Sequence, residues 1–416
     1  MTIARAGWPS PADFGTVPSA ADIARWEDAD RAARPARLAR LRERFADAGI
    51  DAYYGVRREH MRYLTGFTLA EGEERAAGSS GQFLVGGDEV VVFADSRYTI
   101  QARRQAPESR LEAVYGDLPS HWSDLVGSIG ARRVGVEAGF VPHAVWGRLA
   151  AAAPNVELVP VEGWVEGDRA TKEPSEIERI AAACAVADRA LATLLPEIVT
   201  GATEAALALR LEWLIRTGGA EALAFDVACL SGPEAALPHG APGDRPVRDG
   251  AVLLFDFGAQ VAGYRSDMTR TLFVGEPVAR DLDVYELVAR AQAEAIAALR
   301  EAVERVGTGA GELPSGRAVD KVARDVIGAA GHADHFGHTL GHGIGLATHE
   351  SPSLGMRAPE TPLPSPTVFS VEPGVYLDGE TGVRIEDLVE IDTVAARLER
   401  LTRFPREVVV VGREAG

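Results

Sequence analysis

The sequence predicts a fold of the α+β class in two parts, a smaller α/β domain followed by a larger α+β domain. The chain has 416 residues, which is too long for one ordinary core. Up to about residue 165, short β-rich runs alternate with helical patterns, whereas long Ala-rich helical patterns and paired apolar strands follow. Between them, the stretch EGWVEGDRATKEPSEIER interrupts both patterns with proline and mixed charge, so we expect the boundary there.

The first part is predicted to begin with a helix. Residues 1–34 are rich in Pro and Ala and are interpreted as an extension or lead-in helix. Helical spacing of apolar residues from Pro35 to Phe45 predicts a helix that Gly49 ends. A domain over residues 35–165 follows, with strands in IDAYYGV, QFLVGG, EVVVFADSRY and RRVGVEA, a turn at GGD after the second strand, and a helix over 142–153.

The second part, residues 172–416, is predicted to combine long helices with antiparallel strands. Ser175 and Glu178 have the spacing of a capping box and are expected to begin a long helix. Thr203 is the expected cap of the next helix. Three further helices are expected over residues 203–216, 281–306 and 317–330. The segments AVLLFDFGAQ, GYRSDMTRTLFV, TVFSVEPGVYL and GVRIEDLVEI are the expected strands.

The composition is that of a soluble globular protein with 46% hydrophobic and 25% charged residues. A formal net charge of −18 disfavours nucleic acid and anionic membranes as partners. No apolar run reaches the ~18 residues of a membrane span, and no secretory signal is expected at the N-terminus. Cys184 and Cys229 are expected to be buried thiols, and two cysteines give no disulfide framework, which favours a cytoplasmic location.

Five residues that can bind a metal ion occur in the second part, each inside a short apolar or Gly-marked segment. They are Asp256, Asp267, His342, Glu372 and Glu386. Any one of these carboxylates alone would be interpreted as a solvated strand residue. Together they are costly to bury unless a cation neutralises them. A pair of divalent cations would do so and would also supply a mechanism of hydrolysis.

Two hairpins are predicted to bring the carboxylates together in pairs. If the turn lies between Val261 and Ala262, Asp256 faces Asp267 across an antiparallel ladder, with their Cβ atoms ~5 Å apart. A turn centred on Gly379 would place Glu372 opposite Glu386 in the same way. Because proline cannot donate a hydrogen bond to a ladder, Pro373 makes this second register less regular.

Histidines cluster close to these carboxylates in the sequence. His338, His342 and His349 lie in GHTLGHGIGLATHE, where the glycines oppose a helical zinc motif and are expected to let the backbone pass close to a site. His239 lies in the Pro/Gly loop ALPHGAPGD, which suits either a substrate contact or an exposed loop residue. His332 and His335 are expected at the surface or behind the site.

These segments together resemble the pita-bread metallopeptidases, which include aminopeptidase P, prolidase and methionine aminopeptidase. The resemblance rests on SGPEAALPHG, LLFDFGAQVAGYRSDMTRT, HTLGHGIGLATHE, FSVEPGVY and GVRIED, in that order and spacing. The first part resembles the creatinase-type N-terminal domain of the proline-specific members through YLTGF and FADSRY. Two departures are Glu234, where the family often has Asn, and Ser365-Pro366-Thr367, where Gly-Met is common before the VEPG strand.

The resemblance implies a role for each matching residue. The metal ligands would be Asp256, Asp267, His342, Glu372 and Glu386. The substrate-facing histidines would be His239, His338 and His349, and Arg384 matches an arginine two positions before the last ligand. Glu372 would accept and pass the proton, His349 with His239 would stabilise the oxyanion, and Arg384 would orient Glu372 or another ligand.

The function implied is that of a dinuclear Xaa-Pro aminopeptidase, in which a hydroxide shared by two divalent metal ions attacks the scissile bond. Mn²⁺ is the expected ion, with Co²⁺, Zn²⁺ and Fe²⁺ as alternatives, because the ligands are mostly oxygen with one imidazole. The substrates would be small peptides with proline at the second position, and the resemblance implies a homodimer. The alternative is an Xaa-Pro dipeptidase (prolidase). A methionine aminopeptidase, a creatinase-like hydrolase and a non-catalytic peptide- or protein-binding relative fit less well.

Overall fold

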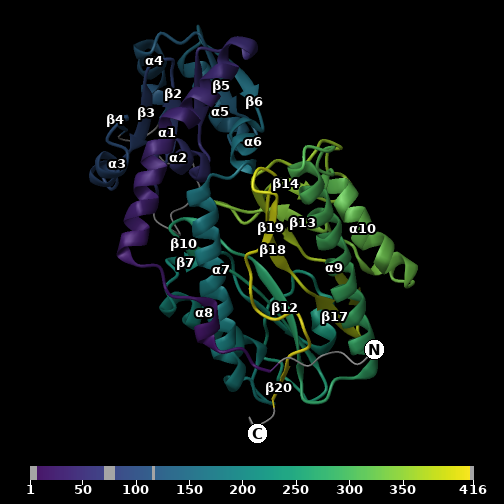
Figure 1. Cartoon of the computed structure of the whole chain (residues 1–416). Coiled ribbons are helices and arrows are strands. Elements are labelled where there is room, and N and C mark those ends of the chain that lie inside the picture. The colour runs from purple at the N-terminus through teal and green to yellow at the C-terminus, as the bar shows by residue number, and fades with distance from the viewer. Residues whose placement is uncertain (1–6, 70–79, 115–117, 413–416) are drawn as a thin grey trace. The chain divides into compact units, whose positions relative to one another are not determined.

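The computed structural model describes residues 7–69, 80–114 and 118–412, and the chain divides into two compact units. The N-terminal unit comprises residues 24–168 (Figure 1). The C-terminal unit comprises Arg169 onward together with the start of the chain up to Ile23. No helix in the described part of the chain is long and apolar enough to cross a membrane.

The N-terminal unit is built on one six-stranded mixed sheet. Its strands run in the order β4-β3-β2-β1-β5-β6, with antiparallel pairing between β1, β2 and β3 and parallel pairing elsewhere. The strands are β1 (Ala52–Gly55), β2 (Gln82–Val85), β3 (Val90–Ala94), β4 (Arg110–Ala113), β5 (Arg133–Glu137) and β6 (Glu157–Val161). Gly86 N donates to Glu89 O at 2.9 Å, which closes the predicted turn between β2 and β3.

The sheet of this unit is accompanied by helices, some of which the sequence patterns did not predict. They are α1 (Ala20–Ala48), α2 (Arg58–Thr65), α3 (Thr99–Gln105), α4 (Pro119–Ser128), α5 (His143–Ala152) and α6 (Trp164–Ala170). The first helix begins at Ala20 rather than at Pro35. Ser19 and Asp22 explain this start, because each backbone N–H donates to the other residue's side chain, at 3.0 and 3.2 Å.

The described residues of the C-terminal unit include a short 3-10 turn near the chain start, η1 (Pro11–Phe14), and four long helices. These are α7 (Pro174–Leu194), α8 (Glu204–Thr217), α9 (Ala279–Gly307) and α10 (Gly316–Ala329). The predicted Ser175 cap of α7 is wrong, because Glu173 is the N-cap and forms the capping box with Glu176, with Pro174 at the first helical position. The predicted Thr203 cap of α8 is confirmed, since its hydroxyl accepts from Ala206 N at 3.2 Å.

The strands of this unit form several small sheets, mostly antiparallel. One has the order β20-β12-β9-β8 and another the order β14-β13-β15-β18-β19, while β16 pairs with β17 and β10 lies between β11 and β7. Their bounds are β7 (Ala222–Leu223), β8 (Ala228–Ser231), β9 (Val252–Phe257), β10 (Ala259–Val261), β11 (Tyr264–Arg265), β12 (Met268–Val274), β13 (Gly341–Gly343), β14 (Glu350–Leu354), β15 (Thr367–Val371), β16 (Gly374–Leu377), β17 (Thr381–Arg384), β18 (Asp387–Asp392), β19 (Arg397–Arg400) and β20 (Val410–Val411).

The core of the C-terminal unit lies between α9, α10 and these strands. Leu299 of α9, Ile327 of α10, Phe369 of β15 and Val389 of β18 belong to one buried apolar cluster and are each 0% exposed. Cys184 on α7 and Cys229 on β8 are also fully buried, and both are free thiols. Burial raises the pKa of each thiol well above its usual value.

Candidate metal centre

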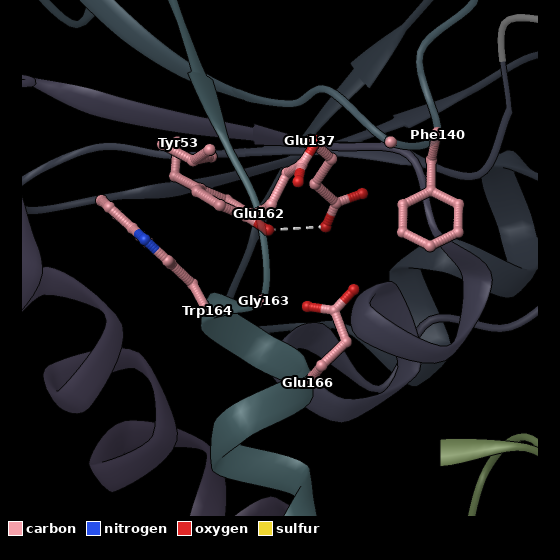
Figure 2. A pocket seen from close by; sticks show the side chains of 9 residues that line it. Tyr53, Glu137, Phe140, Glu162, Gly163, Trp164 and Glu166 are labelled. Atoms are coloured by element: carbon pink, nitrogen blue, oxygen red, sulfur yellow. Dashed lines mark hydrogen bonds between the residues drawn. The ribbon is translucent and has the colours of Figure 1, made fainter. Parts of the chain in front are cut away.

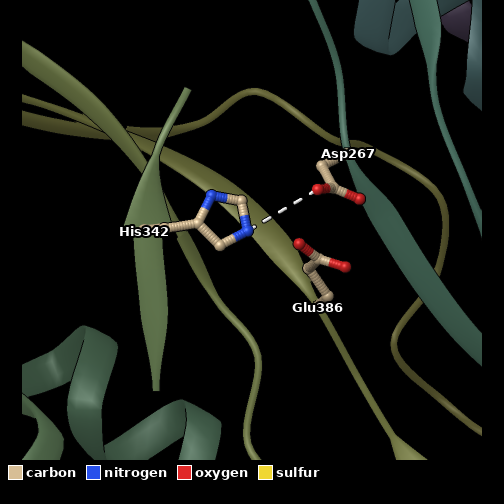
Figure 3. Close-up of side chains that lie close together, drawn as sticks. All are labelled: Asp267, His342 and Glu386. Carbon is tan, nitrogen blue, oxygen red and sulfur yellow. Dashed lines mark ion pairs between the residues drawn. The ribbon is translucent and has the colours of Figure 1, made fainter. Parts of the chain in front are cut away.

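Three of the predicted ligands converge in the C-terminal unit: Asp267, His342 and Glu386 (Figure 3). One ligand atom from each lies within 4.8 Å of the others. Asp267 directly precedes β12, His342 is the middle residue of β13, and Glu386 lies between β17 and β18. Three segments that are well separated in the sequence therefore meet at one point.

His342 presents its Nε2 atom to the carboxylates. Its Nδ1–H donates to Gly343 O at 3.1 Å, so Nε2 is the ring nitrogen that faces the carboxylates. Nε2 lies 3.7 Å from Asp267 Oδ2 and 3.2 Å from Glu372 Oε1. A fourth predicted ligand, Glu372, thus contacts the group of three through His342.

The glycines beside His342 let its strand pack against two neighbours. A Cβ atom on Gly341 would lie 1.9 Å from Ser370 O of β15. A Cβ atom on Gly343 would lie 2.1 Å from Ser351 O of β14. The strand forms because both positions lack a side chain, and the helical zinc motif that the His338–His342 spacing allows does not occur.

The first hairpin has a register that differs from the predicted one. Asp256 pairs with Thr269 rather than with Asp267. The turn is formed by Ala262 and Gly263, with φ of 46° and 84°, and lies one residue later than expected. Since Asp267 precedes Thr269 by two positions, it points to the same face as Thr269 and Asp256. The two aspartates are diagonal neighbours instead of an opposed pair.

The second hairpin follows the predicted register. Val371 pairs with Asp387 on one side of the two glutamates, and Gly374 pairs with Arg384 on the other. This register places Glu372 opposite Glu386 and centres the turn on Gly379, which has a φ of 70°. Around Pro373, the arms change from the sheet of β15 and β18 to the pair β16–β17, so both acids lie where the ladder is interrupted.

Arg384 is held by several polar groups and contacts Asp256 rather than Glu372. Its Nη2 donates to Asp256 Oδ2 at 2.7 Å and its Nε to Thr269 Oγ1 at 2.8 Å. Its Nη1 donates to Tyr376 Oη at 2.8 Å. Thr269 Oγ1 in turn donates to Glu386 Oε2 at 2.9 Å. Arg384 and Thr269 therefore connect Asp256 to the group around His342.

The crowding of acids shifts their pKa values in opposite directions. Burial, followed by repulsion from neighbouring carboxylates, raises the pKa of Asp267 and of Glu386 well above the usual range. Burial also raises the pKa of Asp256, although Arg384 opposes it. Glu372 and His342 form the remaining pair, and burial works against ionisation of both side chains. Their mutual hydrogen bond and charge nevertheless bring the pKa of Glu372 to about 2 and that of His342 to about 9.

These residues fit a divalent cation. Asp256 Oδ1 and Glu386 Oε1 are buried and make no hydrogen bond within the part of the chain that the structure describes. A buried carboxylate oxygen without a donor is costly, and a cation is the partner that removes the cost for several at once. Carboxylates with one imidazole are typical ligands of Mn²⁺, Co²⁺, Fe²⁺ and Zn²⁺.

The three predicted substrate-facing histidines differ in their surroundings. The ring of His349 lies 4.3 Å from that of His342, centroid to centroid. Burial lowers the pKa of His349, and the charges of His342 and His239 lower it further. His338 Nε2 lies 2.8 Å from Tyr376 Oη, and burial lowers the pKa of this histidine too. His239 is exposed in its loop.

The two other histidines of this region pair with each other. His335 is the last residue of η4 (Ala333–His335), and His332 directly precedes this turn. Their Nδ1 atoms lie 3.2 Å apart.

Three residues that hold the group together were not predicted from the sequence, namely Thr269, Ser370 and Tyr376. Ser370 Oγ donates to Glu372 Oε1 at 2.9 Å and accepts from His342 N at 3.0 Å. The alternation of strand side chains was an available signal for the first two, because Thr269 and Ser370 lie two positions from Asp267 and Glu372 and share their faces. No comparable signal marks Tyr376, whose contacts come from a different hairpin arm and from His338.

Comparison with known proteins gives matches over both units. Residues 178–393 match the family model described as Metallopeptidase family M24, and residues 37–171 match the Creatinase/Prolidase N-terminal domain. An uncharacterised peptidase of Bacillus subtilis is 34% identical over 375 residues, covering 90% of this chain and 100% of the relative. An Xaa-Pro dipeptidase of Pyrococcus furiosus is 31% identical over 373 residues, covering 90% of this chain and 99% of the relative.

Solved structures give the same result. The chain is similar to an Xaa-Pro dipeptidase from Bacillus anthracis, with a TM-score of 0.80 and 31% identity, covering 91% of this chain and 100% of that one. It is also similar to an X-Pro aminopeptidase from Thermotoga maritima, with a TM-score of 0.76 and 33% identity, covering 87% of this chain and 98% of that one.

Proposed function

The chain belongs to Metallopeptidase family M24, and on that premise we propose that it is a metal-dependent dipeptidase that cleaves Xaa-Pro dipeptides. The observation that carries the proposal is likeness along the full length to proteins named Xaa-Pro dipeptidase, combined with the grouping of Asp267, His342 and Glu386. The function expected first from the sequence is the Xaa-Pro aminopeptidase, with the Xaa-Pro dipeptidase as the alternative. The relatives support the second of these more strongly.

The residues that would hold the metal are Asp256, Asp267, His342, Glu372 and Glu386. We propose two divalent ions, because the four carboxylates of this set carry more negative charge than one divalent ion neutralises. Mn²⁺ is first among the candidates, since the donors are mostly oxygen with one imidazole. Ions bound there supply Lewis acidity and a nucleophile at neutral pH. The homodimer that the family resemblance implies is also a proposal, which the molar mass in solution tests.

The protein's own groups would handle the proton and the developing charge. The hydrogen bond from Ser370 Oγ to Glu372 Oε1 would hold this carboxylate in place to accept a proton and pass it on. His349, beside the His342 ring, would donate to the carbonyl oxygen of the scissile bond, with His239 approaching from its loop. Arg384 fixes the orientation of Asp256 through the 2.7 Å bond from Nη2.

Proline at the second position of the substrate supports selection by shape. Its peptide nitrogen has no hydrogen to donate, and its ring fixes φ near −65°. A site that gives no acceptor to that nitrogen and packs against the ring would therefore favour Xaa-Pro over other dipeptides. Two polar groups beside the candidate centre would border such a site. They are the half-buried His338 and the buried Tyr376, whose Nε2 and Oη atoms lie 2.8 Å apart.

Hydrolysis of Ala-Pro against Ala-Pro-Ala by the Mn²⁺-loaded full chain tests the proposal. We expect rapid release of alanine from the dipeptide and at least about a hundredfold lower kcat/KM for the tripeptide, a difference of about 2.7 kcal/mol in transition-state binding. Asp267→Ala is the inactive control. Removal of the first residue from the tripeptide at an equal rate would instead favour the Xaa-Pro aminopeptidase, the second candidate, which the likeness to the Thermotoga maritima enzyme supports.

A further inference from the structure

A cavity in the N-terminal unit is separate from the residues of the candidate metal centre. Its volume is about 240 Å³, and none of its lining residues is basic. The lining combines acids and aromatic rings: Glu137, Glu162, Glu166, Tyr53, Phe140 and Trp164 (Figure 2). We propose that this cavity binds a small organic cation, an alkylguanidinium or alkylammonium compound. This proposal is independent of the peptidase activity.

Glu137 provides a fixed negative charge at the back of the cavity. It is 3% exposed and accepts from Tyr53 Oη at 2.7 Å, from His60 Nδ1 at 2.6 Å, and from the backbone N–H groups of Val56 and Arg57 at 2.7 and 2.9 Å. Burial raises its pKa, but the hydrogen bonds from His60 and Tyr53 outweigh this and lower it. Four donors occupy both oxygens, so Glu137 adds charge and rigidity but no free acceptor.

The free acceptors come from Glu162 and Glu166. Glu166 uses Oε1 to pair with Arg57 Nη1 at 3.2 Å, and no hydrogen bond of its Oε2 is found among the described residues. Glu162 is exposed and has neither a hydrogen bond nor an ion pair within the same residues. His60 lies behind Glu166: it is 1% exposed, and its Nε2 lies 3.7 Å from Glu166 Oε1 without a hydrogen bond to any described residue. Negative charge is in excess along this wall.

The aromatic rings complete a site of the kind that recognises organic cations. Figure 2 shows Trp164 and Phe140 on opposite sides of the space, with the Glu166 carboxylate between them. The indole of Trp164 is itself held against Tyr53, with ring centroids 6.0 Å apart and planes 18° apart. A cation between such rings gains from their negative faces as well as from the carboxylates.

The chain's own Arg57 demonstrates this recognition at the edge of the cavity. Its guanidinium carbon lies 4.7 Å from the centroid of the Phe140 ring, while Nη1 pairs with Glu166. One guanidinium is therefore already bound by an aromatic face and a carboxylate of the lining. Glu162 and Trp164 offer the same two kinds of group to a second cation.

The size and charge of the cavity limit what it can bind. A volume of about 240 Å³ is smaller than a site for a drug-sized ligand, so a compound of a few heavy atoms fits and a peptide does not. Three carboxylates in the lining disfavour an anion. An uncharged compound would leave the excess charge unpaired, whereas a guanidinium or ammonium group pairs with Glu162 and the free Glu166 oxygen.

Calorimetric titration of the full chain with n-butylguanidinium tests the proposal, and n-butylurea serves as its uncharged counterpart of nearly the same shape. We expect a dissociation constant of about 1 mM for the cation at low salt, no measurable binding of the urea, and clear weakening in 0.5 M NaCl. The titration is repeated with n-butylammonium. This compound should also bind if the cavity recognises positive charge rather than the planar shape of the guanidinium group.

Variants assign the binding to this cavity. Glu162→Gln and Trp164→Leu should each weaken n-butylguanidinium binding at least about fivefold, since each removes one charged or aromatic contact. Glu162 is exposed, so its variant tests the proposal without a risk to folding. The matched control is Glu157→Gln, because Glu157 begins β6, the strand that ends just before Glu162, and pairs with Arg133 at 3.2 Å without lining the cavity. Asp267→Ala should bind the cation like the native chain.

Several outcomes would overturn the proposal. These are no binding of either cation, equal binding of n-butylurea, unchanged affinity in both Glu162→Gln and Trp164→Leu, or loss of binding in Asp267→Ala. The last result would place the cation at the candidate metal centre instead. None of these outcomes bears on Xaa-Pro hydrolysis, which uses other residues.

Discussion

Single residues decide how the candidate centre is held, and Arg384 is the clearest example. It is 4% exposed and donates hydrogen bonds to Asp256, Thr269 and Tyr376. A buried guanidinium with several acceptors around it is fixed in one orientation, because losing any acceptor leaves a donor without a partner. We infer that Arg384 sets the position of the Asp256 carboxylate more than it provides charge to the reaction.

Tyr376 is predicted to couple Arg384 to His338. Tyr376→Phe removes the hydroxyl that lies 2.8 Å from both Arg384 Nη1 and His338 Nε2. We expect a loss of about 1 to 2 kcal/mol in stability and a fall of about tenfold in kcat for an Xaa-Pro dipeptide.

The matched control for this change is Tyr285→Phe. Tyr285 Oη donates to Arg406 O at 2.9 Å, in the same unit but in a different part of it. That variant should lose similar stability and keep its turnover. Equal kcat values for Tyr376→Phe and the native enzyme would show that the hydroxyl has only a structural role.

Asp188 on α7 is predicted to make stability depend on pH. Burial raises its pKa from 3.8 to about 6, against the opposing N–H donors of Arg403 and Phe404. The folded chain therefore binds this proton more tightly than the unfolded chain, so the stabilisation is complete below about pH 4 and is lost as pH rises through 6. Relative to Asp188→Asn, the native chain should lose about 2 to 3 kcal/mol between pH 4 and pH 7.

Urea unfolding of both proteins at pH 4, 5.5 and 7 measures this difference, with metal present throughout. A difference in unfolding free energy that stays constant over the range would mean that folding does not raise the pKa of Asp188.

At the scale of residues, the sequence predicts five metal ligands, of which the structure groups Asp267, His342 and Glu386, but it does not indicate the groups that orient them. The prediction was possible because carboxylates and imidazole inside apolar or Gly-marked segments are unusual. Thr269, Ser370 and Tyr376 are common strand residues, and only their contacts across hairpins distinguish them. Those contacts depend on register, which single-residue patterns do not fix.

At the scale of elements, the two hairpins show when register can be predicted. Gly379 alone marks the second turn, and the pairs on either side of Glu372 and Glu386 follow from it. In the first hairpin the turn uses Ala262 with a φ of 46°, a conformation that alanine rarely adopts. The side chain of Ala262 therefore gave no indication of the turn, and the expected pairing of Asp256 was wrong. The start of α1 was missed for another reason, because the Ser19–Asp22 cap precedes a proline that suggests a boundary.

The glycines of β13 lead to a prediction about this element. Gly341→Ala would place a methyl group 1.9 Å from Ser370 O, so β13 has to move away from β15. We expect a loss of about 1 to 3 kcal/mol in stability and weaker metal binding, because His342 moves with its strand. Metal content after dialysis and the thermal midpoint measure the two effects.

Gly337→Ala is the control for that substitution. Nothing lies within 4 Å of a Cβ atom at Gly337, which precedes the same segment. This variant should retain both metal and stability. If Gly341→Ala behaves in the same way, the close approach of β13 to β15 does not determine the position of His342.

At the scale of the whole molecule, the division into a mixed-sheet unit and a strand-and-helix unit could be predicted from pattern and length. Both domain types agree with the family matches over residues 37–171 and 178–393. The assignment of the chain start to the C-terminal unit could not be predicted. Trp8 Nε1 donates to Val410 O at 2.8 Å, a contact between the two ends of the sequence that no local pattern encodes.

Because the candidate metal ligands all belong to the C-terminal unit, removing the metal should destabilise that unit and spare the N-terminal one. Chelation leaves Asp267, Glu386 and Asp256 buried near one another without a cation, which costs the C-terminal unit stability. In differential scanning calorimetry, we expect EDTA to lower the transition of that unit by an amount equivalent to several kcal/mol and to leave the N-terminal unit unchanged. Addition of Mn²⁺ should restore the transition. An identical thermogram from protein shown to be metal-free would contradict the fit of these residues to a cation.

The burial of both cysteines has a practical consequence. Maleimides and disulfide reagents attack the exposed thiolate, and Cys184 and Cys229 are 0% exposed with raised pKa values. The folded protein therefore behaves toward these reagents as if it had no cysteine. A cysteine introduced at one surface position in each unit can carry a donor and an acceptor dye with the native thiols left in place. Energy transfer between the dyes would then measure the distance between the two labelled positions.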